Sequence, residues 1–357
     1  MDPRPVLFVT NHAPPHRVGA FAALHEREAV EFALIGGEAR HGGGGTAGGP
    51  FPFPVHHVAQ REVLALAGSG DYRAVVAGLS GRVALPAAHA GARRARVPFV
   101  LWATLWAHPR TAAHALSYLP LRRLYRDADA IVTYGPHVSR YVRSKGVRAP
   151  VFEAPQAVDG AYWSSPADAP NRQSAYQAAF VGRLEGEKGV TVLLSAWRTS
   201  GLRAPQAALA LVGGGRFRAP SFATSAVLSA GRVPPGEVRN FYAGSDVVVV
   251  PSVRTREFLE PWGLVVNEAF HQGTPVIATT AVGAVAGGLV RDGRNGLVVA
   301  PGDANALAGA LRRLHDDPDL RARLGARARE DVAPYTQAAW ADGVSRALGS
   351  AGVSRLP

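Results

Sequence analysis

Short apolar runs alternate with longer amphipathic segments along most of the chain. In the first half the runs end at glycine, proline or a polar residue, and the segments between them carry apolar residues at helical spacing. Residues 20–28 have this helical pattern after a loop at residues 11–19. The strands predicted in this half are residues 6–10, 32–35, 74–77, 99–102 and 130–134. This alternation predicts parallel strands joined by helices, and so an α/β fold.

The alternation stops and then begins again in the second half. Residues 159–173 are rich in Pro, Ser, Ala and Asp, which is typical of a linker between domains. Beyond them the predicted strands are residues 178–182, 207–212, 247–251 and 276–278, and the predicted helices are residues 306–314, 318–332 and 336–348. We therefore expect two α/β domains, at residues 1–165 and 172–335, with ligands at the carboxyl ends of their strands.

Composition supports two folded domains and excludes several chemistries. The chain has 357 residues, more than one hydrophobic core usually covers, and 47% of them are hydrophobic while 18% are charged. It has no cysteine. A disulfide framework, a thiolate metal site and a cysteine nucleophile are therefore excluded.

The net charge of +12 is carried almost wholly by arginine, since Lys145 and Lys188 are the only lysines. Either coding bias or a functional basic face explains this surplus, and both explanations stay open. No basic run is interleaved with aromatic residues, so nucleic acid is not an expected partner. No apolar stretch approaches the roughly 20 residues of a membrane span, and the N-terminus has no signal-peptide layout. We expect a cytoplasmic protein whose basic N-terminal face suits the anionic inner surface of a membrane.

Two cations follow a predicted strand in the second half. The strand ends at Gly182, and Arg183 and Lys188 come next, before a helical pattern at residues 190–197. Cations at the mouth of a strand and beside a helix N-terminus favour a diphosphate. Arg183 can bind it through two hydrogen bonds, and Lys188 as a point charge. For this segment alone, a solvated turn is an equally good interpretation.

A second segment adds two carboxylates. Glu260 lies in the loop after the strand at residues 247–251, and Glu268 lies on the helix that follows. Pro261 and Gly263 leave the backbone at the helix entrance open, so that its free N–H groups face an anion or a hydroxyl. Carboxylates accept hydrogen bonds from paired sugar hydroxyls. The segment therefore predicts contacts to the two sugars of one nucleotide sugar.

Glu260 and Glu268 resemble the E-x7-E motif of retaining glycosyltransferases of the GT-B fold, in particular family 4. The order of other segments resembles this family as well, over roughly residues 178–315: residues 180–189, 211–215, 231–233 and 242–252. The resemblance implies two Rossmann-like domains that face each other across a cleft. It also implies that a last helix, at about residues 336–357, packs back on the N-terminal domain.

The resemblance also implies a role for each matching residue. Arg183 and Lys188 would hold the donor diphosphate and stabilise the leaving nucleotide. Glu268 would bind the ribose hydroxyls, and Glu260 the transferred sugar. The backbone around Gly263 and Leu264 would hold the sugar or the distal phosphate. The remaining substrate contacts would come from Pro261 and Trp262 at the helix entrance and from Arg232 and Val233 at the base-binding edge.

The first half carries weaker matches to the same family. Gly19 ends the loop at residues 11–19, where the family has a glycine-containing loop that faces the donor phosphates. His108 matches the family histidine that approaches the donor sugar, although a histidine that caps a loop fits the sequence equally well. Asn11 and His12 follow a strand and are candidates for acceptor contacts.

Metal and redox chemistry are not expected. Asp127 and Asp129 spell D-x-D, but they stand between a predicted helix and a predicted strand, which indicates a structural turn. Family 4 enzymes generally need no divalent metal. The glycines at residues 213–215 do not follow the G-x-G-x-x-G layout of a dinucleotide site, and no Walker A sequence is present. We therefore expect neither a metal nor a cofactor.

The predicted function is a retaining, metal-independent hexosyltransferase (EC 2.4). It would move a sugar from a nucleoside-diphosphate sugar to a glycan or lipid-linked acceptor. The sequence around Trp262 resembles family members associated with cell-surface polysaccharide synthesis. Two alternatives stay open, a sugar-nucleotide epimerase of the same architecture and a non-catalytic nucleotide-sugar-binding protein.

Overall fold

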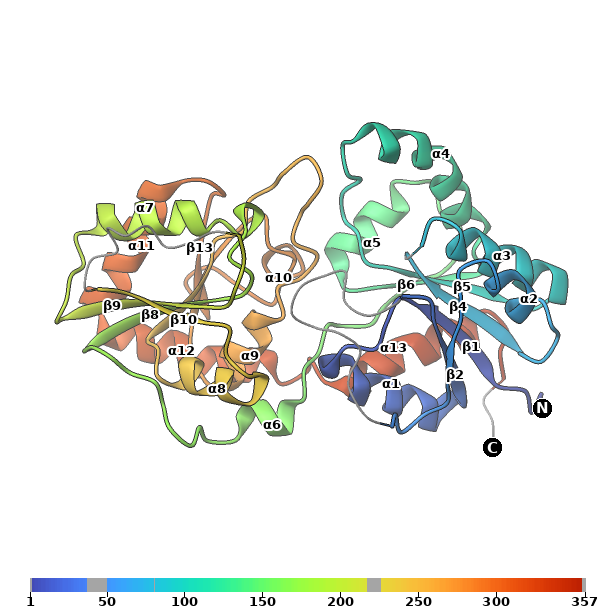
Figure 1. Ribbon diagram of the computed structural model, residues 1–357, viewed down its shortest axis with the longest axis horizontal. Helices are drawn as coiled ribbons and strands as arrows, with labels where there is room; N and C mark the ends of the chain where they lie inside the picture. Colours follow the sequence, from blue (N-terminus) through green and yellow to red (C-terminus); the bar gives the residue numbers. More distant parts are fainter. Residues whose placement is uncertain (1, 37–49, 80, 217–225, 355–357) are drawn as a thin grey trace. The chain divides into compact units, whose positions relative to one another are not determined.

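The computed structural model describes residues 2–36, 50–79, 81–216 and 226–354. The chain forms two compact units (Figure 1). Unit 1 consists of Met1–Asp159 together with Tyr335–Pro357, and unit 2 consists of Gly160–Pro334. The last helix therefore belongs to unit 1.

A parallel sheet forms the centre of unit 1. In the described residues its strand order is β3-β2-β1-β4-β5-β6-β7. The strands are β1 Val6–Thr10, β2 Val30–Leu34, β3 Val55–His57, β4 Ala74–Gly78, β5 Phe99–Ala103, β6 Ala130–Thr133 and β7 Val151–Glu153. The helices are α1 Pro15–Glu28, α2 Val63–Ala67, α3 Ala84–Ala95, α4 Ala112–Asp127, α5 Pro136–Arg143 and α13 Gln337–Ser350.

Helices cover both faces of this sheet, which is why its central strands β1, β4 and β5 are buried at every position and almost wholly apolar. Successive side chains of β1 point to opposite faces. Phe8 packs with Phe21 of α1 and Trp340 of α13, whereas Leu7 belongs to the cluster that contains Ala88 of α3. Helices α1 and α13 pack against each other on the first of these faces (Figure 1).

The loop predicted at residues 11–19 is shorter in the structure, because α1 begins at Pro15. Proline suits the first position of a helix, since it has no N–H to leave unpaired there and its φ is already helical. Gly19 therefore lies inside α1, so its placement in a loop was wrong. A Cβ at Gly19 would lie 2.2 Å from Oε1 of Gln337, so a larger residue there would displace the end of the Gln337 side chain.

Unit 2 is also built on a parallel sheet. Its described strands have the order β10-β9-β8-β11-β12-β13. They are β8 Tyr176–Val181, β9 Ala207–Val212, β10 Val227–Gly231, β11 Val247–Val250, β12 Val276–Thr279 and β13 Gly296–Val299. The helices are α6 Gly160–Ser164, the 3₁₀ turn η1 Gly186–Lys188, α7 Val190–Ser200, α8 Pro235–Ala243, α9 Val265–His271, α10 Gly283–Ala286, α11 Ala304–Asp316 and α12 Pro318–Val332.

The segment predicted as a linker, residues 159–173, belongs to unit 2 from Gly160 onward. It contains α6, and two hydrogen bonds tie α6 to α8. The Tyr162 hydroxyl donates to the Gly236 carbonyl at 3.0 Å, and Arg239 Nη1 donates to the Tyr162 carbonyl at 2.9 Å. These bonds hold the segment against α8, although its composition had indicated a linker.

Candidate functional site

Lys188 and Glu260 form an ion pair at the carboxyl ends of neighbouring strands. Lys188 ends η1 in the loop after β8, and Glu260 lies in the loop after β11. The Lys188 Nζ donates to Oε2 of Glu260, and the side chains are 21% and 8% exposed. The Ser252 hydroxyl donates to the same oxygen at 3.2 Å. The sheet thus brings together two residues that are 72 positions apart in the sequence.

Gly189 allows the two loops to meet. Its φ is +73°, and a Cβ there would lie 1.9 Å from the carbonyl oxygen of Pro251, at the end of β11. Only glycine fits such an approach. Helix α7 begins immediately after Gly189, so Lys188 also lies next to the N-terminal, positive end of that helix.

Arg183, the other predicted phosphate ligand, lies in the same loop as Lys188. Its Nη2 donates to Oε1 of Glu187 at 3.1 Å, and its side chain is 39% exposed. The Glu187 carbonyl in turn accepts from the backbone N–H of Val253 at 3.0 Å. Arg183 is therefore an accessible cation held on the loop that carries Lys188.

Glu268 is the second carboxylate of the site. It lies on α9, and the Tyr242 hydroxyl at the end of α8 donates to its Oε2 at 2.5 Å. Burial raises the pKa of Glu268 to about 7, while the hydrogen bond from Tyr242 acts in the opposite direction. Burial also raises the pKa of Tyr242 well above its usual value, so the phenol keeps its proton. Near neutral pH, Glu268 therefore exchanges readily between its charged and neutral forms.

The backbone from Pro261 to Leu264 leads into α9. Gly263 has a φ of +92°, and Leu264 is the residue before the helix. The Trp262 side chain is only 3% exposed, and its Nε1 donates to Oδ1 of Asn267 at 2.7 Å. The indole is thus engaged inside unit 2, and its predicted contact with a substrate stays a prediction.

The predicted base-binding edge, residues 231–233, lies at the end of β10, beside the ends of β9 and β8. The N–H of Gly213 donates to the Gly231 carbonyl at 2.7 Å, and the N–H of Leu184 donates to the Gly214 carbonyl at 3.0 Å. Arg232 is exposed beside Gly214, where an added Cβ would lie 2.8 Å from its Cγ. Val233 follows at a half-buried position. The loops after these three strands are therefore in contact.

His108 lies in unit 1, in the loop between β5 and α4. Its Nε2 is 2.6 Å from the His114 carbonyl oxygen, so this nitrogen carries the proton and donates. Its ring packs against Tyr118, and its Nδ1 has no hydrogen-bond partner among the described residues. The approach of this ring to a donor sugar stays a prediction.

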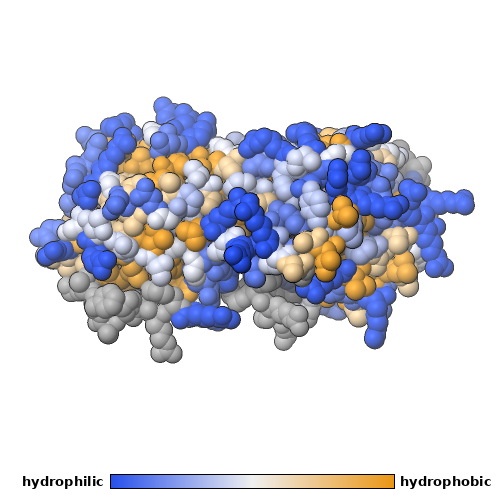
Figure 2. Space-filling model, turned by 90° about the horizontal axis from the view of Figure 1, so that it is seen from above, coloured by the Kyte–Doolittle hydropathy of each residue, from blue (hydrophilic) through white to orange (hydrophobic). Residues whose placement is uncertain are grey.

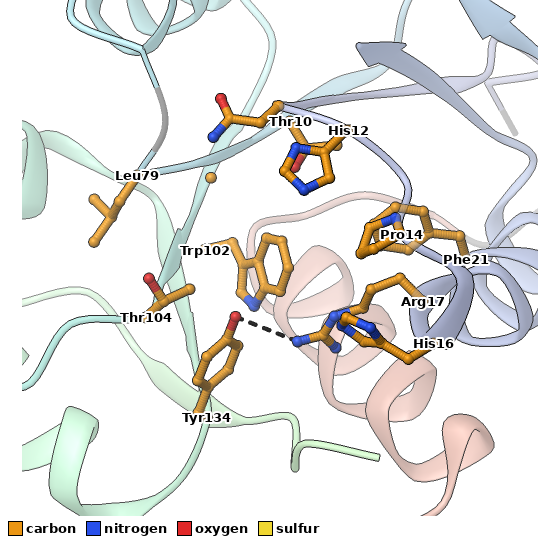
Figure 3. A pocket seen from close by; sticks show the side chains of 12 residues that line it. Thr10, His12, Pro14, His16, Arg17, Phe21, Leu79, Trp102, Thr104 and Tyr134 are labelled. Atoms are coloured by element: carbon orange, nitrogen blue, oxygen red, sulfur yellow. Dashed lines mark hydrogen bonds between the residues drawn. The ribbon is translucent and has the colours of Figure 1, made fainter. Parts of the chain in front are cut away.

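A cavity of about 390 Å³ lies in unit 1 at the carboxyl ends of its central strands (Figure 3). Asn11 and His12 line it, as do Arg17, Trp102 and Tyr134. The last three were not among the predicted site residues. Trp102 and Tyr134 each lie at or directly after the end of a predicted strand, which is the signal that could have identified them.

The D-x-D sequence makes local contacts. The Asp129 carboxylate accepts from the backbone N–H of Phe99 at 2.8 Å, and the Asp127 carboxylate accepts from Nε of Arg123 at 3.3 Å. Within the described ranges, no group of three or more His, Asp or Glu side chains is arranged to hold a metal ion. The absence of a metal in the reaction stays a prediction.

Comparison with known proteins places these features in context. Residues 163–331 match the model of the family described as glycosyl transferases group 1. The lipopolysaccharide core biosynthesis glycosyltransferase LpsE of Rhizobium meliloti is 33% identical over 241 residues, 63% of this chain and 66% of that protein. The D-inositol 3-phosphate glycosyltransferase of Corynebacterium diphtheriae is 36% identical over 189 residues, 48% of this chain and 42% of that protein. The match thus spans less than two thirds of either relative.

A solved structure agrees with the whole fold. The crystal structure of HepE from Anabaena in complex with UDP has a TM-score of 0.74, is 19% identical, and covers 97% of this chain and all of that chain. This likeness confirms the predicted GT-B fold of two Rossmann-like units.

Proposed function

We propose that this chain, whose residues 163–331 match the group 1 glycosyl transferases, is a retaining glycosyltransferase that uses a nucleoside-diphosphate sugar. The observation that carries the proposal is the Lys188–Glu260 pair, which lies where parallel α/β sheets bind their ligands. Two relatives named as glycosyltransferases and a similar structure that contains UDP support it. The name of LpsE supports a role in cell-surface polysaccharide or glycoconjugate synthesis.

In this proposal Lys188 binds the donor diphosphate and stabilises the charge that builds on the leaving nucleotide. Lys188 and Arg183 supply the positive charge that a metal ion supplies in other enzymes. As the Lys188 ammonium turns to the diphosphate, the Glu260 carboxylate becomes available to a hydroxyl of the transferred sugar. The Ser252 hydroxyl keeps Glu260 in place during this exchange, since it donates to the same carboxylate.

Glu268 takes the ribose in the same proposal. Its carboxylate accepts from the ribose hydroxyls, and the Tyr242 phenol orients it. The bond between the anomeric carbon and the phosphate oxygen breaks. The acceptor oxygen bonds to that carbon on the same face, and the leaving phosphate takes the acceptor proton. The product keeps the anomeric configuration of the donor.

A ligand panel tests the donor site. The melting temperature is measured with UDP, GDP, ADP, dTDP and CMP, without added metal. A nucleotide that binds unit 2 and is present at 100 times its Kd is expected to raise the free energy of unfolding by about 2.7 kcal/mol. Glu268→Ala is expected to reduce that shift, whereas Arg198→Ala, an exposed residue of α7, is expected to leave it unchanged.

Other results of the panel would support a different function. If no nucleotide shifts the melting temperature, the donor site is contradicted. If a nucleotide sugar binds but is neither transferred nor converted, the non-catalytic alternative gains support. If a bound nucleotide sugar is converted into an isomer with no acceptor present, the protein is an epimerase. Transfer of the sugar to an added acceptor with retained configuration supports the proposal.

We also propose that α4 of unit 1 contacts an anionic membrane surface. Leu116 and Leu119 are 83% and 68% exposed, and Arg123 and Arg126 lie further along the same face of the helix at helical spacing. Exposed leucines beside arginines suit a layer of acidic headgroups. Figure 2 shows hydrophobic groups set among hydrophilic ones on the face seen from above. Within the described ranges, no helix is long and apolar enough to cross a bilayer.

Flotation with vesicles tests the membrane contact. The protein is expected to float with vesicles that contain phosphatidylglycerol and to stay behind with neutral vesicles. Replacing both Leu116 and Leu119 with serine is expected to lower the bound fraction at least tenfold, since each leucine buries apolar surface in the lipid. Val83→Ser, at a residue that is 55% exposed elsewhere in unit 1, is the matched control. Equal flotation of both variants would contradict the role of α4.

A further inference from the structure

Unit 1 contains a buried arginine, Arg17, that forms no ion pair with any described residue. Arg17 is 5% exposed, on the first turns of α1. No ion pair between described residues includes Arg17, and the groups that act on its charge are neutral ones. An isolated buried cation is costly, and folded proteins normally pair such a group with an acid. This arginine therefore differs from Arg73, whose buried guanidinium contacts Glu28 at 3.1 Å.

The partners of Arg17 hold its guanidinium in place, but among the described residues only one of its two terminal nitrogens is hydrogen-bonded. Its Nη2 donates to the Tyr134 hydroxyl at 3.3 Å and also to Oε1 of Gln156. The guanidinium lies over the rings of Trp102, Tyr134 and Trp340, with its carbon 5.2, 5.5 and 5.8 Å from the ring centres. Its Nη1 has no hydrogen-bond partner among the described residues. The cation is thus oriented by aromatic rings and neutral oxygens, with donor capacity to spare.

Arg17 lines the space of about 390 Å³ at the carboxyl ends of β1, β4, β5 and β6, a volume typical of small-molecule pockets. Figure 3 shows the guanidinium beside the His16 imidazole and joined to the Tyr134 hydroxyl, while His12 lies farther away, beside Thr10. Thr10 and Thr104 add hydroxyl groups to the lining. None of the described lining residues is acidic, so nothing in the cavity repels an anion.

We propose that this cavity binds a phosphate or carboxylate group of a sugar ligand, with Arg17 as its counter-ion. A planar guanidinium offers the paired donors that match both of these groups. Imidazole and hydroxyl groups around it supply further donors. Bound there, the anion would neutralise a buried charge that no described acidic residue pairs with, so the electrostatic interaction favours binding.

Two molecules carry such a group if the proposed function holds. One is the acceptor, as a phosphorylated or acidic sugar, and the other is the donor with its diphosphate. We infer that the acceptor is the source, because the cations proposed to bind the donor diphosphate, Lys188 and Arg183, lie in unit 2. This assignment rests on the proposed function, whereas the anion site itself does not.

Calorimetry on the full chain in low-chloride buffer tests the site. The probes are glucose 6-phosphate, glucuronate, inorganic phosphate and uncharged glucose. The two acidic sugars are expected to bind at least tenfold more tightly than glucose, and Arg17→Gln is expected to abolish the difference. Arg27→Gln, at an exposed position on the same helix, is the matched control and is expected to bind like the wild type.

Stability separates a binding role from a structural one. If Arg17 serves as the counter-ion of a bound anion, Arg17→Gln removes a buried charge that no described acid pairs with, so its melting temperature without ligand is expected to stay unchanged or rise. A lower melting temperature together with unchanged binding of the acidic sugars would show that Arg17 only supports the fold. Tyr134→Phe is a second variant, which keeps the ring and loses one oxygen partner of Arg17. It is expected to weaken binding of the acidic sugars several-fold.

Titration with the nucleotide sugar identifies the source of the anion. Unchanged donor affinity in Arg17→Gln, with lost binding of acidic sugars, supports the acceptor. A tenfold loss of donor affinity in Arg17→Gln instead assigns the site to the donor diphosphate. The anion site is overturned if wild-type protein binds neither acidic sugars nor phosphate, or binds them as the Arg17→Gln variant does. Failure of every nucleotide to bind would overturn the proposed transferase and leave the result for acidic sugars standing.

Discussion

Lys188→Ala is expected to lower kcat about 100-fold or more, which is the usual loss when one charged contact to a leaving group is removed. The Lys188 Nζ lies at the carboxyl end of β8, beside the N-terminus of α7, where it can meet the charge on a departing phosphate. Arg183→Ala is expected to cost less, because that side chain is 39% exposed and surrounding water screens it. Initial rates with the nucleotide sugar identified by the panel measure both effects.

The stability of Lys188→Ala needs a separate measurement, because the change also leaves the buried Glu260 carboxylate without its cation. Removing one partner of a buried pair costs about 3 kcal/mol. The double variant Lys188→Ala with Glu260→Gln removes that charge, so it is expected to regain stability and to remain inactive. Recovery of activity in the double variant would show that the rate loss came from the stranded carboxylate. In that case Lys188 is not the phosphate ligand.

The sequence predicted the central strands of both sheets and missed the strands at their edges. Strands β1 and β9 and helix α12 have the predicted bounds, and the other predicted strands differ by one or two residues. Strands β3, β7, β10 and β13 were not predicted, and each is an outer strand. Outer strands are only partly buried, so their residues need not form an apolar run. Hydrophobic pattern identifies a strand only where both faces are covered.

The positions of the site residues after predicted strands could be predicted from the sequence. Contacts that depend on which strands are neighbours in the sheet could not. The positions of Lys188 and Glu260 after two strands indicated a shared edge, but their pairing requires β8 and β11 to be neighbours. That adjacency comes from the sheet. Arg17 was placed in a loop, because the helix start at Pro15 was not recognised. Its burial also depends on Trp340, which comes from the far end of the chain.

The affinity for a nucleoside-diphosphate sugar is expected to fall as the pH is lowered through 7. Burial raises the pKa of Glu268 to about 7, and the ribose hydroxyls need its charged form as acceptor. Below pH 7 the carboxyl takes up a proton that donor binding must displace. Kd is therefore expected to rise about tenfold per pH unit, to about 100-fold at pH 5, and to be constant above pH 8. A nucleotide sugar suits this titration, because its diphosphate has no group that ionises in this range.

The same carboxyl affects stability with the opposite trend. Its pKa in the folded state lies above the value of 4.5 for a free side chain, so its contribution is fully present below pH 4.5 and is lost as the pH rises through 7. A difference of this size corresponds to about 3 kcal/mol in the free energy of unfolding. Denaturant unfolding of the wild type at pH 5 and pH 8 measures it. The apo protein is therefore expected to be more stable at the acidic pH, where it binds the donor less well.

Glu268→Gln shows whether Glu268 itself is the group that titrates. Glutamine keeps the shape and an oxygen that accepts from Tyr242, and it cannot ionise. Its donor affinity and its unfolding free energy are expected to be nearly constant between pH 5 and pH 8. If the variant follows the same pH profile as the wild type, the titrating group is another one. If the affinity of the wild type rises toward pH 5, the protonated carboxyl binds the ribose as a donor, and the direction of that hydrogen bond is reversed.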